Sequence, residues 1–150
     1  SIEVAKELLE LGWKRAGIFV YDNEEKIENI QANQYFKGEY KLKELRDVKR
    51  MHEDIIHAPQ LHEILEVLPD QITIFDKKRN GFEGRSHYWL FYKMNVDEEM
   101  NHTNYGLYHI DYSNALSRDT LEGSEFLDKN PHDAAAKLLI WCIKNKFVTL

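Results

Sequence analysis

The sequence predicts an α+β fold, in which helices pack against an antiparallel sheet of four to five strands in the manner of an α–β–α sandwich. Apolar residues recur with helical spacing near the start, middle and end of the chain, and β-branched and aromatic runs lie between them. Three consecutive runs are joined by connections too short for helical crossovers, so their strands should pair antiparallel. The 150 residues contain no linker-like tract, which predicts a single domain over residues 1–150.

Three helices are predicted from apolar stripes. The first spans residues 2–11 and ends at Gly12, a residue typical of helix C-termini. The second spans residues 59–68 and the third residues 130–145, and both have a proline in the first turn, where its missing N–H costs nothing. The only cysteine, Cys142, lies on the apolar stripe of the last helix. It should pack in the core rather than react, because a helix C-terminus disfavours a thiolate.

The first half of the chain carries weaker patterns between its helices. Residues 18–21 are β-branched and aromatic and predict a strand, and the acidic residues 22–25 predict a turn after it. Residues 31–36 would pair back on that strand or remain irregular. Apolar residues at a spacing of three predict a short helix or helical turn over residues 41–50, with charges of both signs on its solvent face.

The second half of the chain predicts a three-stranded meander. Strands are expected over residues 71–75, 87–94 and 105–112, and the second of these is strongly aromatic. A polar loop with an Asn-Gly turn dipeptide is expected over residues 76–85, and an acidic loop over residues 113–129. About half of the aromatic side chains should face the helices, which leaves the others for a docking or stacking surface.

Composition and charge exclude several classes of protein. The net charge is −6 with 43% hydrophobic and 31% charged residues, and the basic residues gather in two islands, 37–50 and 76–93. Because general duplex binding needs a broad positive surface, the charge pattern argues against a nucleic-acid partner. No run of apolar residues is long enough to span a bilayer. A single cysteine suits a reducing compartment, so we expect a cytoplasmic protein without a membrane partner.

One pair of residues, His109 and Asp111, has side chains suited to catalysis. They stand two apart on a predicted strand and therefore project from one face, as a general base and its orienting partner or two metal ligands would. The competing interpretation, which we favour, is a polar, solvated strand face, because spacing places no third ligand or nucleophile nearby. His52, His57 and His62 are five residues apart, which does not bring them together on a helix. The sequence therefore predicts neither a metal site nor a cofactor.

A candidate binding site lies around the second basic island. Basic side chains crowd the loop before the aromatic strand, with aromatic rings beside them, and this combination suits a phosphate or an acidic protein surface. The residues are Lys77, Lys78, Arg79, Phe82, Arg85 and Trp89. The alternative is a solvated hairpin loop whose charges suppress aggregation.

Four short motifs occur in an order that suggests a family. They are Leu11-Gly12-Trp13-Lys14, Ala58-Pro59-Gln60-Leu61-His62-Glu63-Ile64-Leu65 with Leu68-Pro69, Tyr88-Trp89-Leu90-Phe91, and Pro131-His132-Asp133-Ala134-Ala135-Ala136-Lys137-Leu138-Leu139. This order resembles small bacterial phage- and mobile-element-encoded proteins with an α–β–α sandwich domain, a family of unknown function. The segments 22–57 and 113–129 depart from the compact pattern of that family.

Two functions follow as hypotheses. The first is an accessory protein of phage or mobile-element type that acts by non-enzymatic binding to a protein or small ligand through its aromatic and charged patches. The alternative is a small metal-assisted hydrolase or nucleotide-processing enzyme that uses His109, Asp111 and a further histidine. The aromatic strand 87–94 would also allow a homodimer, if it lies at a sheet edge.

Overall fold

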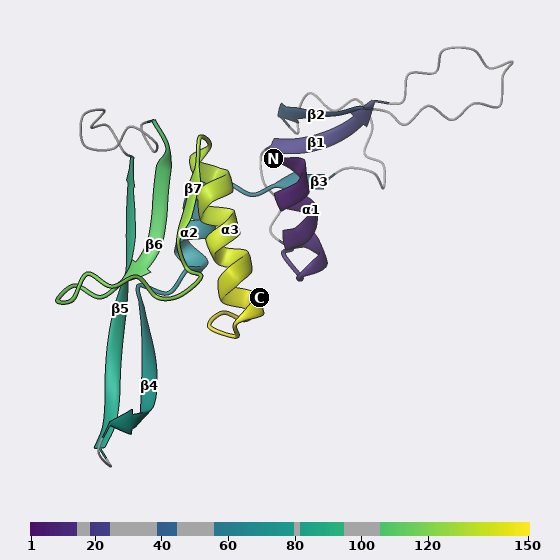
Figure 1. Ribbon diagram of the computed structural model, residues 1–150. Coiled ribbons are helices and arrows are strands. Elements are labelled where there is room, and N and C mark those ends of the chain that lie inside the picture. The colour runs from purple at the N-terminus through teal and green to yellow at the C-terminus, as the bar shows by residue number, and fades with distance from the viewer. Residues whose placement is uncertain (15–18, 25–38, 45–55, 80–81, 95–105) are drawn as a thin grey trace, which may run out of the picture. The chain divides into compact units, whose positions relative to one another are not determined.

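The computed structural model describes residues 1–14, 19–24, 39–44, 56–79, 82–94 and 106–150. The chain divides into two compact units, Ser1–Gln60 and Leu61–Leu150. Figure 1 labels the helices and strands of both units.

The N-terminal unit contains one helix and a small antiparallel sheet. Helix α1 (Ile2–Glu10) precedes strands β1 (Phe19–Glu24), β2 (Glu39–Glu44) and β3 (Ile56–Ala58), and the strand order is β2-β1-β3. The helix ends at Glu10 and is capped by Leu11, and the predicted stop residue Gly12 follows directly. Gly12 has φ 103°, a conformation that suits glycine, and the next N–H, of Trp13, returns to the carbonyl of Leu8 at 2.9 Å.

Two predictions for this unit are wrong. The turn expected over residues 22–25 is contradicted because Asp22, Asn23 and Glu24 continue β1 and pair with β2. The helical turn expected over residues 41–50 is contradicted where it is described, because Lys41–Glu44 lies in β2. The sequence Glu-Tyr-Lys-Leu-Lys-Glu also alternates with a period of two, and pairing to β1 selects that pattern over the helical one. The strand left open over 31–36 lies outside the described residues.

The C-terminal unit confirms the α+β fold class. Its four-stranded antiparallel sheet has the order β4-β5-β6-β7, and two helices accompany it (Figure 1). The elements are α2 (Leu61–Val67), β4 (Gln71–Arg79), β5 (Phe82–Met94), β6 (Tyr108–Ser113), β7 (Phe126–Asp128) and α3 (Pro131–Lys144). The three predicted helices and the antiparallel meander are therefore present.

Two predicted loops in this unit contain strand. The loop expected over residues 76–85 is instead the far end of a long hairpin, because β4 runs to Arg79, β5 starts at Phe82, and the two residues pair. The Asn-Gly dipeptide itself lies outside the described residues. The loop expected over residues 113–129 contains β7, which is short and mixed in character and so gives no alternating pattern.

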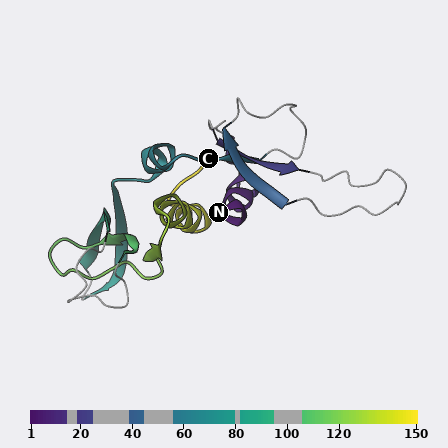
Figure 2. The same cartoon turned by 90° about the horizontal axis from the view of Figure 1, so that it is seen from above.

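The four-stranded sheet has a helix-covered face and an open face. Ile72, Ile110 and Tyr112 are almost completely buried on the first face. Side chains alternate between the two faces along a strand, and Trp89 and Phe91 of β5 are exposed on the open face. Figure 2 looks along α3 and shows α2 and α3 on one side of the four-stranded sheet and the segment between β6 and β7 on the other. The open face therefore leaves aromatic side chains of β5 in contact with solvent.

The terminal helix α3 supplies much of the core. Three of its residues on one stripe, Leu138, Leu139 and Cys142, have no exposed surface. Asn130 caps the N-terminus by accepting a hydrogen bond from a backbone N–H at 3.0 Å. At the other end the chain turns through Lys146 at φ 64°, and the ring of the following residue, Phe147, stacks on Trp141 with centroids 5.3 Å apart. No described helix is both long and apolar enough to cross a membrane.

Candidate functional site

A cavity of about 450 Å³ opens on the exposed face of the four-stranded sheet. Its floor comes from β5 and β6, and its wall from the segment that follows β6. The lining residues are Phe91, Lys93, His109, Asp111, Ser113, Asn114, Ala115, Arg118 and Thr120. All of these lining residues belong to the C-terminal unit.

The strand register explains the composition of the floor. Phe91 lies opposite Asp111, and Lys93 lies opposite His109, in the antiparallel pairing of β5 with β6. Because side chains alternate along a strand, these four residues project from the same face. The expectation that His109 and Asp111 share a face is thereby confirmed.

The wall of the cavity is a tightly hydrogen-bonded loop. The side chain of Asn114 accepts hydrogen bonds from the N–H groups of Leu116 and Ser117 at 2.9 and 3.1 Å, which forms an Asx turn. The N–H of Arg118 then donates to the carbonyl of Asn114 at 2.8 Å. Arg118 has φ 62°, in the left-handed region that disfavours an L side chain. The loop therefore holds a cationic side chain at the cavity in a costly backbone conformation.

A buried serine fixes the chain just after this loop. The Ser124 hydroxyl has no exposed surface, accepts the N–H of Tyr112 at 3.2 Å and donates to the carbonyl of Leu121 at 2.8 Å. The N–H of Leu121 in turn donates to the carbonyl of Tyr112 at 2.8 Å. These contacts tie the segment before β7 to β6, and they bring the next residue, Glu125, beside His109.

Three potential ligand groups converge at this point. His109 Nε2 lies 2.9 Å from Asp111 Oδ2 and 3.2 Å from Glu125 Oε1. The Asp111 side chain is only 8% exposed, whereas that of Glu125 is 53% exposed. The Ser113 hydroxyl donates to Asp111 Oδ1 at 2.7 Å and so fixes the orientation of the carboxylate. One ligand atom from each of the three residues lies within 4.8 Å of the others.

Neither contact to the imidazole is a hydrogen bond. Nε2 of His109 is buried and has no hydrogen-bonding partner among the described residues, although two carboxylate oxygens lie close to it. A hydrogen bond requires the acceptor to lie near the N–H direction, and these oxygens lie off that line. The arrangement therefore places three electron-pair donors around a common point.

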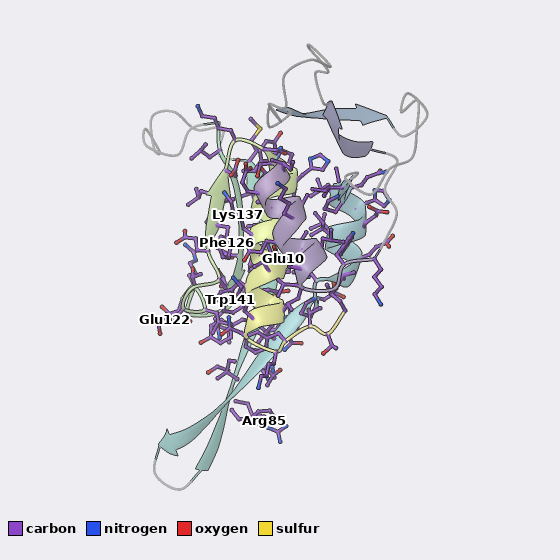
Figure 3. All side chains as sticks on the ribbon, turned by 90° about the vertical axis from the view of Figure 1, so that its right-hand side faces the viewer. Glu10, Arg85, Glu122, Phe126, Lys137 and Trp141 are labelled. Carbon is purple, nitrogen blue, oxygen red and sulfur yellow. The ribbon has the colours of Figure 1, made fainter. Side chains whose placement is uncertain are left out.

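The binding residues predicted from the sequence lie elsewhere, along the β4–β5 hairpin. Lys77, Lys78 and Arg79 belong to β4 and Phe82 begins β5, but the placement of their side chains lies outside what is described. The other two predicted binding residues have described side chains. Arg85 lies 5.3 Å from the centroid of the Phe75 ring, a cation–π contact. Figure 3 shows Arg85 on the projecting part of the hairpin, away from α3.

Trp89 connects the hairpin to the cavity region without lining the cavity. It is 38% exposed, and in the sheet it lies opposite Gln71 on β4 and Ser113 on β6. The Trp89 ring also lies 6.0 Å from that of His87. The aromatic surface expected from the sequence therefore runs along the open face, through Trp89 and Phe91, toward the cavity.

Sequence reasoning missed Glu125 and Arg118. Glu125 follows Asp111 by fourteen residues in a loop, where no periodic pattern predicts its direction. Arg118 lies in the same segment. No local sequence pattern predicts a positive φ at an arginine. The nearest signal is the Asn114 turn, since asparagine at such a position is typical of a tight loop.

Two other reactive groups considered from the sequence, Cys142 and His62, do not line this cavity. Cys142 is fully buried, and burial raises the pKa of its thiol to about 12, so it remains protonated and inert at neutral pH. His62 is exposed on α2, His57 lies in β3, and His52 falls outside the described residues.

Comparisons with known proteins give no information about the role of this site, so its interpretation depends on its geometry alone. No protein-family model matches the chain, and no curated protein or solved structure matches it either. The resemblance to phage-encoded proteins consequently stays a prediction.

Proposed function

We propose that the protein acts by binding a small anionic organic ligand in the cavity on the open face of the sheet. The observation that carries this proposal is the Arg118 loop, which holds a cation at a cavity wall in an unfavourable backbone conformation. Backbone strain of this kind persists where the surrounding structure enforces it, and it concentrates at ligand sites. The proposal keeps the non-enzymatic binding hypothesis and moves it from the hairpin loop to the cavity.

The charges of the cavity support an anionic group in the ligand. Lys93 and Arg118 approach it from the floor and the wall, and neither forms a salt bridge within the described part of the chain. Two unpaired cations lining one concave surface attract a carboxylate or phosphate, and an arginine can bind either with two parallel hydrogen bonds.

The shape of the cavity supports a ligand with a planar ring. Phe91 lines the floor and is 46% exposed, so its ring is available for stacking. A volume of about 450 Å³ lies within the range of small-molecule sites. A nucleoside monophosphate combines the required anion and ring, and it is therefore the probe we choose.

The experiment is a calorimetric titration of the full chain with adenosine monophosphate, with inorganic phosphate and adenosine as separate arms. We expect Arg118→Gln to weaken nucleotide binding about ten- to one-hundredfold, because a hydrogen bond to a charged group contributes about 1.5–3 kcal/mol. Arg85→Gln is the matched control, since it removes the same charge from the same sheet but outside the cavity, and should change the affinity less than twofold.

Each result is decisive for the proposed location. An absence of heat with all three probes refutes the anionic-ligand proposal. Weakening by Arg85→Gln but not by Arg118→Gln returns the site to the hairpin loop. Binding of phosphate alone as tightly as the nucleotide shows that the ring does not contribute.

A metal-assisted hydrolase is the second candidate function. The observation that favours it is that His109 and Asp111 line the same cavity as the two cations. Release of phosphate from the nucleotide probe, measured with and without added Zn²⁺ or Mn²⁺, separates an enzyme from a binding protein. The phage or mobile-element origin also remains a proposal. The homodimer required strand 87–94 to lie at a sheet edge, whereas β5 lies between β4 and β6 in the sheet.

A further inference from the structure

We infer that His109, Asp111 and Glu125 form a binding site for a divalent transition-metal ion. The inference does not rest on the proposed function, because it uses His109 and Asp111 on the cavity floor together with Glu125, whereas the proposed function rests on Arg118, Lys93 and Phe91. It also differs from the sequence hypothesis, which required a second histidine. Here the third ligand is a glutamate supplied by the segment before β7.

The distances within the cluster suit a single ion. A metal ion bound by imidazole and carboxylate groups has bonds of about 2.0–2.2 Å, so two adjacent ligand atoms lie roughly 3.0–3.5 Å apart. The distances from His109 Nε2 to the Asp111 and Glu125 oxygens are 2.9 and 3.2 Å. A set of one nitrogen and two carboxylate oxygens is also chemically suited to Zn²⁺ and its neighbours in the first transition row.

The second observation is the unpartnered state of the imidazole nitrogen. His109 Nε2 is buried, and no described residue gives it a hydrogen bond. A buried polar atom of this kind is costly unless something outside the chain satisfies it. A neutral imidazole offers a lone pair at Nε2, and a cation between that atom and the two carboxylates would satisfy all three groups together.

The surroundings of Asp111 point to the same conclusion. Its side chain is more than nine-tenths buried, and a carboxylate so placed requires a compensating positive charge. Within the described residues no lysine or arginine pairs with it. The hydroxyl of Ser113 donates to Oδ1 and leaves Oδ2 beside the imidazole. Metal-bound carboxylates are commonly held in this way by an outer hydrogen-bond donor.

The competing explanation is that His109 is simply an imidazolium ion between two carboxylates. That arrangement would satisfy the charges without a metal, but an imidazolium N–H stabilises a carboxylate most when it points at the oxygen. An N–H at Nε2 of His109 points at neither the Asp111 nor the Glu125 carboxylate oxygen. The experiment must therefore separate metal binding from a purely internal ion pair.

The test is titration of the full chain, purified without a histidine tag, with Zn²⁺ by calorimetry and with Co²⁺ by visible absorption. We expect one equivalent of Zn²⁺ to bind, and Co²⁺ to give the d–d bands of a low-symmetry site. Glu125→Gln should weaken Zn²⁺ binding tenfold or more. Because this side chain is half exposed, the variant should fold like the parent protein, which circular dichroism checks.

The matched control is Glu122→Gln, which removes the same charge three residues earlier in the same segment. Glu122 is exposed and projects from the surface in Figure 3. This control should leave Zn²⁺ affinity within twofold of the parent value. The inference is overturned if the parent protein binds neither ion, or if Glu125→Gln and Glu122→Gln weaken binding equally. Nucleotide binding without metal binding would overturn this inference and leave the proposed function intact.

Discussion

Replacing Arg118 with glycine should stabilise the protein while it weakens ligand binding. Arg118 occupies the left-handed region at φ 62°, and its N–H is held by the carbonyl of Asn114 at 2.8 Å. Glycine adopts this conformation without a steric penalty, so Arg118→Gly removes the strain and keeps the backbone hydrogen bond. The same change removes the guanidinium from the cavity wall.

The magnitude follows from two opposing terms. A left-handed conformation costs an L residue about 1–2 kcal/mol, and Arg118→Gly removes this cost from the folded state. Glycine also gives the unfolded chain more conformational freedom, which destabilises the folded state by about 0.5–1 kcal/mol and offsets part of the gain. We therefore expect the free energy of unfolding to rise by about 0.5–1 kcal/mol. In a chain of this size that gain raises Tm by roughly 1–4 °C.

The assay is urea and thermal unfolding, followed by tryptophan fluorescence and circular dichroism, together with the nucleotide titration. Lys146→Gly is the matched control, because Lys146 has φ 64° at the end of α3 and does not line the cavity. It should give the same gain in stability with unchanged nucleotide affinity. If Arg118→Gly is less stable than the parent protein while Lys146→Gly is more stable, the Arg118 side chain is stabilising and the strain argument for the site is refuted.

Three further changes test the packing that supports the site. Tyr112→Phe should lower the free energy of unfolding by about 1–2 kcal/mol in urea titrations, because the Tyr112 hydroxyl donates to the carbonyl of Pro69 at 2.7 Å; an unchanged midpoint would contradict this. Gly123→Ala should cost about 1–2 kcal/mol, since φ is 76° and a Cβ would lie 3.0 Å from Nε1 of Trp141; unchanged thermal stability would show that the indole yields freely. Burial alone would raise the pKa of Asp128, but hydrogen bonds from a lysine of α3 and from a backbone N–H outweigh it and lower the pKa below 3.8. The stability difference between the parent and Asp128→Asn should therefore be present at pH 6 and disappear as the pH falls through that lowered pKa; a difference that persists in strong acid would contradict the sign.

Local patterns predicted the elements whose stabilising interactions lie close together along the chain. Helix α3 has its cap, first-turn proline and apolar stripe within sixteen residues, and both of its ends fall where the sequence placed them. Gly12 likewise lies just past the end of α1 because a left-handed terminus favours glycine wherever it occurs. The side-chain alternation along β6 placed His109 and Asp111 on one face, since the period of a strand is fixed by its backbone.

Local patterns failed where pairing decided the structure. The residues 41–44 suit a helical turn by spacing, but they form β2 because β1 lies beside them. The polar ends of the β4–β5 hairpin suit a loop by composition, yet Arg79 and Phe82 pair across it. For residues 41–44 the ladder hydrogen bonds come from β1, which lies outside any local window around them. In the hairpin the paired residues are close in sequence, and their polar composition concealed the pairing.

The sequence by itself determined the α+β class, the three helices, the antiparallel meander and the inert role of Cys142. Only the tertiary structure decided where the candidate site lies. Buried Ser124 ties the segment before β7 to β6, and this contact brings Glu125 to His109 and Asp111. The convergence depends on hydrogen bonds between residues up to twelve positions apart. Their geometry is fixed by packing rather than by periodicity, so it becomes visible only when the chain is folded.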